Sequence, residues 1–165
     1  MKSLRRLGLV FTAILFAAAA WAGDGGNAAW EKMKSLAGEW SGDSPYGKVQ
    51  ISYKVVSSGK ALMESIREPD GSEMMTVYHP DGSRLVMTHY CSSGNQPRMR
   101  AEGLSAEGKK LAFAYVDVTN LSSPDSLHMV RLAMTFDDAN HFTEEWTSLE
   151  KGKENTHAIK LTRQK

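Results

Sequence analysis

The sequence contains little cysteine and little proline, and it has no long apolar segment after its first residues. Cys91 is the only cysteine among 165 residues, which excludes a scaffold held together by disulfides. With 5 prolines, 14 glycines and 41% hydrophobic residues, the chain is neither collagen-like nor wholly disordered. This composition is typical of a globular protein, and the length suits one domain.

The chain also lacks a surplus of basic residues once its first 22 residues are set aside. Those residues contain Lys2, Arg5 and Arg6 and no acidic side chain. Removing these three cations from the 20 Lys and Arg leaves 17, against 19 Asp and Glu, a net charge of −2. Nucleic-acid binding needs a basic face, so the sequence gives no indication of a nucleic-acid partner.

Residues 1–22 have the three parts of a secretory signal peptide. A basic start precedes the apolar run 7–20, and Ala20 and Ala22 place small residues at the positions that a signal peptidase reads. We expect cleavage after Ala22, a linker over 23–27, and a periplasmic or secreted protein without a membrane partner. A membrane anchor is the alternative, but the apolar run is short for a transmembrane helix.

The rest of the chain, 28–165, is predicted to form one domain with a short helix followed by strands. Asn27 suits the N-cap of a helix over 28–36, and apolar and polar residues alternate with a period of two from Val49 to Val55. Further strands are expected at 61–67, 74–79, 85–91, 98–102, 111–118, 127–136, 142–149 and 156–162. Nine or ten strands joined by short turns favour antiparallel pairing, in an all-β up-and-down barrel or a sandwich. The preceding helix favours the barrel, whose end it would cap.

The residues Gly38-Glu39-Trp40-Ser41-Gly42 resemble the start of the calycin superfamily, which includes lipocalins, fatty-acid-binding proteins and nitrobindins. The first strand of these barrels carries a Gly-x-Trp motif behind a short helix, and nitrobindin-like barrels extend it to Gly-x-Trp-x-Gly. The segment 88–100, THYCSSGNQPRMR, resembles the signature of an uncharacterised family of secreted bacterial calycin-like proteins. The resemblance spans roughly residues 28–163 and implies an up-and-down barrel.

A shorter resemblance lies near the end of the chain. Residues 156–163 are similar to the segment in which nitrobindins place the histidine that ligates haem, and His157 stands at that position. The resemblance implies an alternative function, a haem protein that acts on peroxynitrite or nitric oxide with His157 as the axial ligand. The chain departs from nitrobindins at 43–46, where it lacks further alternating glycines.

Strand alternation indicates which polar residues face the lumen, because every second residue of a barrel strand points inward. Five polar residues share a strand face with apolar neighbours, namely Glu64, His89, Cys91, Glu144 and His157. Buried carboxylates need partners, and we expect Arg98 and Arg100 to supply them. Outward-facing arginines that pair with Glu102 are the alternative.

The sequence contains no Gly-x-Ser-x-Gly elbow, zinc-protease motif, phosphate-binding loop or Cys-x-x-Cys pair. We therefore expect a protein that binds a small, partly apolar molecule rather than an enzyme, without a metal or cofactor unless the haem alternative holds. The candidate ligand-binding residues are Trp40, His89, Tyr90, Asn95, Arg98, Arg100, Glu144 and Trp146. Arg98 and Arg100 would anchor an acidic group of the ligand.

Two alternatives remain open at this point. The segment 88–100 is expected to be the main functional one, but the same donors and acceptors would also serve a structural network that holds its turn. The protein is alternatively a non-catalytic structural or interaction protein whose barrel is filled by its own side chains. The sequence indicates no oligomeric state.

Overall fold

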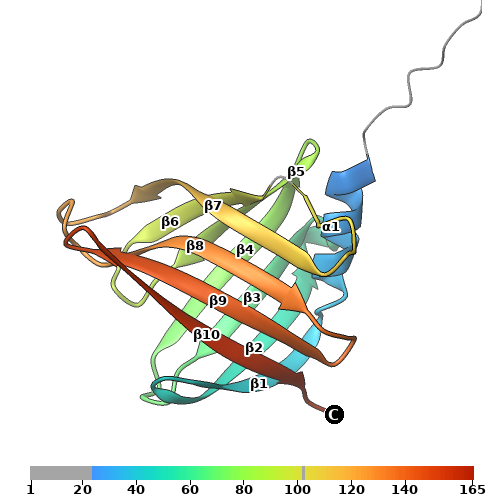
Figure 1. The fold of residues 1–165 in the computed structure, drawn as a ribbon, viewed down its shortest axis with the longest axis horizontal. Helices are drawn as coiled ribbons and strands as arrows, with labels where there is room; N and C mark the ends of the chain where they lie inside the picture. The colour runs from blue at the N-terminus through green and yellow to red at the C-terminus, as the bar shows by residue number, and fades with distance from the viewer. Residues whose placement is uncertain (1–23, 102) are drawn as a thin grey trace, which may run out of the picture.

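The computed structural model describes residues 24–101 and 103–165. The expected signal peptide and its cleavage site lie outside the described residues. One helix stands at one end of ten strands (Figure 1). The elements are α1 (Asp24–Lys34), β1 (Gly38–Ser44), β2 (Gly47–Val56), the 3-10 turn η1 (Ser57–Gly59), β3 (Ala61–Arg67), β4 (Glu73–Asp81), β5 (Arg84–Tyr90), β6 (Gln96–Ala101), β7 (Lys110–Thr119), β8 (His128–Phe136), β9 (His141–Glu150) and β10 (Lys153–Arg163).

The ten strands form a closed barrel in which each strand pairs with its sequence neighbours and β1 pairs with β10. All pairs are antiparallel, and Trp40 and Gly42 of β1 lie opposite Arg163 and Leu161 of β10. The predicted all-β antiparallel barrel with a short preceding helix is therefore confirmed, and the sandwich is wrong. Asn27 lies inside α1 rather than at its N-terminus, because the helix already begins at Asp24.

The helix closes one end of the barrel. Its buried residues Ala29, Trp30 and Met33, with Leu36 just after it, recur at the spacing of one helical face. The helix lies against β4 and β5. Its apolar face thus completes the core at that end, while the turns β1–β2, β3–β4, β5–β6, β7–β8 and β9–β10 surround the opposite end, which we call the mouth.

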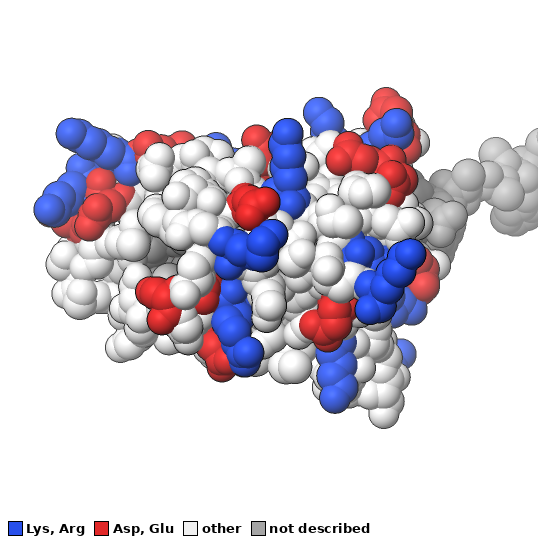
Figure 2. Space-filling model, turned by 90° about the horizontal axis from the view of Figure 1, so that it is seen from below, with Lys and Arg blue, Asp and Glu red and all other residues white. Residues whose placement is uncertain are grey.

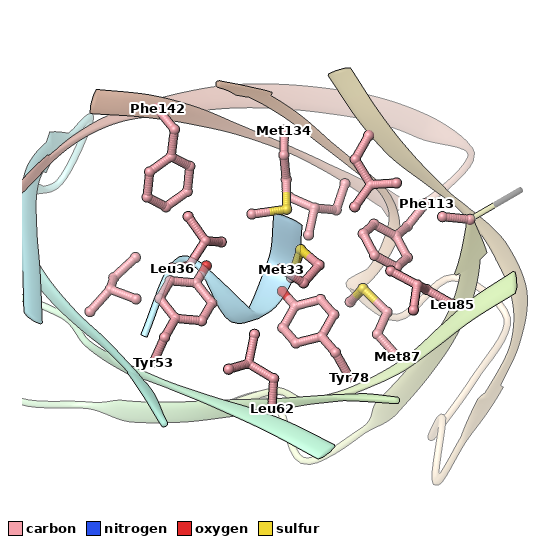
Figure 3. Close-up of a cluster of buried hydrophobic side chains, with 14 of the residues drawn as sticks. Met33, Leu36, Tyr53, Leu62, Tyr78, Leu85, Met87, Phe113, Met134 and Phe142 are labelled. Atoms are coloured by element: carbon pink, nitrogen blue, oxygen red, sulfur yellow. The ribbon is translucent and has the colours of Figure 1, made fainter. Parts of the chain in front are cut away.

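The helix half of the lumen is filled by side chains. Figure 3 shows Phe142, Tyr53 and Tyr78 extending inward from different strands toward Met33 of the helix and Leu36 just after it. All five side chains belong to the buried core. Room for another molecule inside the barrel must therefore be sought toward the mouth.

The outer surface has mixed charge. Lysine and arginine alternate with aspartate and glutamate over the face seen in Figure 2, and neither sign forms one continuous patch there. Among the described residues, no helix has both the length and the apolar character that crossing a membrane requires.

Candidate functional site

A row of polar side chains crosses four neighbouring strands inside the barrel. Tyr53 of β2 lies directly opposite Glu64 of β3, Glu64 opposite Thr76 of β4, and Thr76 opposite His89 of β5. All four side chains are buried, because each occupies an inward position of its strand. Residues that are direct cross-strand partners on one face can interact, so the row forms a connected polar surface within the lumen.

The row is completed by side chains from β4 and β9. The Tyr53 hydroxyl bonds to Oε1 of Glu64 at 2.8 Å and also to Oε1 of Glu144. The Tyr78 hydroxyl donates to Oε2 of Glu64 at 2.8 Å, and Trp146 Nε1 donates to Oε2 of Glu144 at 3.0 Å. We call these residues the polar ring, and its members are Tyr53, Glu64, Thr76, Tyr78, His89, Glu144 and Trp146.

The two contacts of the Tyr53 hydroxyl indicate that one carboxyl group of the polar ring is protonated. A phenol has one hydrogen to donate, so Tyr53 cannot donate to Glu64 and Glu144 together, and one carboxyl must itself donate to the Tyr53 oxygen. Burial raises the pKa of Glu64, and burial together with the nearby charge of Glu64 raises the pKa of Glu144 further. Burial also raises the pKa of Tyr53 and Tyr78, which therefore remain hydrogen-bond donors.

His89 is a neutral imidazole with one nitrogen engaged. It is 1% exposed, and burial lowers its pKa to about 4. Nδ1 lies 3.0 Å from Oγ1 of Thr76. Nε2 has no hydrogen-bond partner among the described residues. An orphaned buried N–H is rarer than an orphaned acceptor, so we assign the hydrogen to Nδ1 and the lone pair to Nε2.

A cavity of about 640 Å³ opens at the mouth of the barrel. Its wall includes the apolar side chains of Met74, Leu127 and Met129 and the polar ones of Ser148, Asn155 and His157. Four carboxylates and two lysines also line it, namely Glu68, Asp70, Glu150, Glu154, Lys151 and Lys153. We call it the mouth cavity.

The polar ring lies directly beneath the mouth cavity. Cys91 and Ser148 line the cavity, and each stands two residues closer to the mouth than His89 of β5 and Trp146 of β9. The rings of His89 and Trp146 are 4.9 Å apart between centroids. The cavity and the polar ring therefore form two successive layers of one lumen.

The structure brings together three of the five polar residues that strand alternation placed in the lumen, and with them the candidate ligand-binding residue Trp146. Glu64, His89, Glu144 and Trp146 all belong to the polar ring. His157 and Cys91 are partly buried and line the mouth cavity, and burial lowers the pKa of His157.

Trp40 lies apart from this group. It is buried at the helix end, where its Nε1 donates to the Leu36 carbonyl at 2.7 Å and its ring packs edge-on against Phe142 at 4.6 Å. Its contacts tie the helix to the barrel wall and do not reach the mouth cavity.

The expectation that Arg98 and Arg100 neutralise the buried carboxyl groups is wrong. Pro97, Met99 and Ala101 take the inward positions of β6, which leaves both arginines exposed on the outer face. Arg98 forms an ion pair there with Asp117, with Nε 2.6 Å from Oδ1. Tyr90 is also on the outer face, 45% exposed.

The turn between β5 and β6 is held by the loop between β7 and β8. Asn95 is buried, and its Nδ2 donates to the Leu127 carbonyl at 2.8 Å. Asn120 donates to the Gly94 carbonyl at 2.6 Å, and Thr119 donates to Gln96 at 2.9 Å. These contacts hold the turn, as expected if the donors and acceptors of segment 88–100 form a structural network.

The sequence analysis did not identify Tyr53, Thr76 and Tyr78 as inward-facing, although strand alternation indicated it. Tyr53 continues the inward face of Val49 and Ile51, and Thr76 and Tyr78 alternate along one strand. The mouth cavity had no such signal, because five separate turns build it.

Fold and site together define a closed antiparallel barrel with one end capped by a helix and the other hollow, which agrees with the calycin-like resemblance at the level of architecture. No protein-family model and no curated protein matches the chain. Within residues 24–101 and 103–165, no three His, Cys, Asp or Glu side chains are placed to hold a metal ion together.

Proposed function

We propose that this protein binds a small, partly apolar molecule in the mouth cavity. The observation that carries the proposal is the cavity itself, with a volume of about 640 Å³ at the uncapped end. Ligand sites in proteins commonly measure about 300–1,000 Å³ and are mostly apolar with a few polar groups. The signal-peptide pattern of residues 1–22 supports an extracytoplasmic location for this function.

The lining supports a ligand with an apolar body. Met74, Leu127 and Met129 offer apolar surface, and methionine adapts to ligands of different shape. Arg98 and Arg100 lie outside the barrel and are no longer candidates for anchoring an acidic group. The four carboxylates of the cavity outnumber its two lysines, so its charge does not favour an anionic ligand.

Nile red, a neutral apolar dye, would test the proposal by fluorescence titration. Ser148 is 8% exposed and lines the cavity, so Ser148→Trp fills the site. Thr162→Trp adds the same ring at an exposed position of β10 and serves as the matched control. We expect Ser148→Trp to lose dye binding and Thr162→Trp to retain it. Equal binding by both variants would contradict the proposal. Mass spectrometry of the protein from its native compartment would then identify the natural ligand.

A haem protein is the second candidate, and the position of His157 favours it. His157 lines the mouth cavity, and burial lowers its pKa, so it offers a neutral imidazole, the usual protein ligand of haem iron. The surplus of carboxylates in the lining fits the haem propionates poorly, which places this candidate second. Bound haem would supply the chemistry with nitric oxide or peroxynitrite. Haemin titration should give a Soret band that His157→Ala abolishes, and a titration without such a band excludes the candidate.

A further inference from the structure

Two buried polar atoms in the layer below the mouth cavity have no hydrogen-bond partner among the described residues, namely His89 Nε2 and Asn95 Oδ1. A buried polar atom without a partner is unfavourable, and each such atom calls for an explanation. We propose that the ligand of the mouth cavity carries a hydroxyl or amino group that donates a hydrogen bond to His89 Nε2. The inference rests on the proposed function and specifies the chemistry of its ligand.

His89 lies one layer of side chains below the cavity. Cys91 lines the cavity and follows His89 on the same face of the chain, about 7 Å away at the usual rise of a strand. Ser148 lines the cavity in the same relation to Trp146, whose ring contacts His89. Cys91 and Ser148, both with short side chains, are thus the cavity residues next to this layer. Nε2 is on the far side of the ring from Cβ and is therefore turned into the lumen.

The protonation of His89 decides which ligand group fits. In the assigned tautomer, Nδ1 donates to Thr76 Oγ1, 3.0 Å away, and Nε2 presents a lone pair. A ligand hydroxyl or amine can donate to that lone pair, whereas a carbonyl or carboxylate oxygen would meet it with a lone pair of its own.

Asn95 offers a second acceptor on the other side of Cys91. Its Nδ2 donates to Leu127, which fixes the amide so that Oδ1 is the free end. The backbone N–H of Cys91 donates to the Asn95 carbonyl at 3.1 Å, so the two residues are direct neighbours. Acceptors thus flank Cys91 on both sides, and the carboxylates of the lining add further acceptors. All of these groups favour a ligand rich in hydrogen-bond donors.

The test compares 2-naphthol with 2-methoxynaphthalene, which share a ring system but differ in the donor hydrogen. We expect the wild-type protein to bind 2-naphthol about fivefold to tenfold more tightly, the effect of one hydrogen bond. His89→Asn keeps an N–H near the position of Nδ1 and removes Nε2, so it should bind both compounds equally. His79→Asn removes an exposed imidazole of β4 and should keep the preference.

The outcomes separate the inference from the proposed function. Equal binding of both compounds by the wild type would overturn the inference and leave the proposed function standing, and binding of neither would overturn both. A preference that His89→Asn retains would show that Nε2 of His89 does not make the contact and would overturn the inference. ¹⁵N NMR of the wild type needs no variant: Nε2 of His89 should resonate as an unprotonated nitrogen and shift when 2-naphthol binds. A protonated Nε2 in the free protein would refute the inference.

Discussion

At the scale of single residues, the contacts of Tyr53 determine how many of the two buried carboxyl groups are protonated. Its hydroxyl lies between Glu64 and Glu144 and can donate to only one of them. The other carboxyl group must be protonated to satisfy the contact. Within the described residues, the polar ring pairs these two acids with no cationic side chain, so a bound proton takes the place of one.

The first prediction concerns Glu144→Gln. The new amide can accept from Trp146 and donate to Tyr53, so the network stays intact without a bound proton. Because folding raises the pKa of both glutamates, the wild-type protein is most stable below the unfolded pKa and loses stability as pH rises through the folded pKa. Over that pH range, we expect the free energy of unfolding of the variant to rise relative to that of the wild type. The rise should be about 1.4 kcal/mol for each unit by which folding raises the pKa. Urea denaturation at a series of pH values measures this.

The control for this experiment is Glu145→Gln, one residue along β9. Glu145 is exposed on the outer face, so its removal should leave the pH dependence of unfolding unchanged. A parallel pH dependence of wild type and Glu144→Gln would show that the carboxyl pair holds no extra proton.

The second prediction concerns His89 and has the opposite sign. Its pKa falls from the ordinary 6.5 to about 4 on folding, so the stability it contributes is full above pH 6.5 and is lost as pH falls through 4. The loss is on the order of 3 kcal/mol by the linkage relation. In His89→Gln, we expect most of this acid sensitivity to disappear from denaturation curves between pH 7 and 4. His157 is half buried, so His157→Gln should remove less of the acid sensitivity than His89→Gln. A larger effect of His157→Gln would contradict the assignment of this acid sensitivity to His89.

At the scale of elements, the Gly-x-Trp-x-Gly motif is where the first strand meets the last. Gly38 has φ +130°, and a Cβ there would lie 2.9 Å from the Arg163 guanidinium. That guanidinium stacks on the Trp40 ring, 4.2 Å from its centroid, and also donates to the carbonyls of Ala37 and Ser35. The motif is thus explained by closure of the barrel rather than by ligand binding.

The third prediction follows from Gly42. A Cβ at this residue would lie 2.4 Å from the Lys160 carbonyl oxygen and 3.0 Å from Ile159. Backbone cannot move aside as a flexible side chain can, so Gly42→Ala should lower the free energy of unfolding by about 1–3 kcal/mol or more. Ser41→Ala, on the other side of the same strand, is the control and should be nearly neutral. Thermal or chemical denaturation compares the two, and equal stability would mean that β1 and β10 are farther apart than described.

The fourth prediction separates the two sides of the β5–β6 hairpin. Asn95→Ala leaves the Leu127 carbonyl without its donor, and we expect a loss of about 1–3 kcal/mol in the free energy of unfolding. Arg98→Ala breaks an exposed ion pair with Asp117, which is worth less than about 1 kcal/mol, and Nile red binding should be unchanged. An Arg98→Ala variant that keeps its stability but loses the dye would restore the arginines to the ligand site.

At the scale of the whole molecule, strand alternation explains which parts of the site were predictable. Glu64 lies between Leu62 and Ile66, and Glu144 between Phe142 and Trp146, so the apolar neighbours identified the inward face. Tyrosine occurs on both faces of strands because it is apolar with a polar tip, and Tyr53 and Tyr78 were therefore overlooked.

Other parts of the molecule were not predictable from local pattern. On β6 the inward residues Met99 and Ala101 alternate with arginines, and the need of the buried acids for partners suggested the opposite orientation. The proton shared through Tyr53 removes that need, and no sequence pattern reports it. The mouth cavity depends on how turns distant in sequence meet, which is a property of the closed barrel alone.

The pairing of β1 with β10 also has a consequence for folding, because it joins the two ends of the domain. Trp40 and Arg163 are partners in one ladder, yet almost the whole domain separates them in sequence. Contacts of such long range form slowly, because the entropy of closing the loop is lost before the contact is gained. Until β10 arrives, the growing sheet has two open edges that can pair with other chains. We therefore expect the pairing that gives the finished barrel no free edge to form late, and the chain to be most prone to aggregation before it forms.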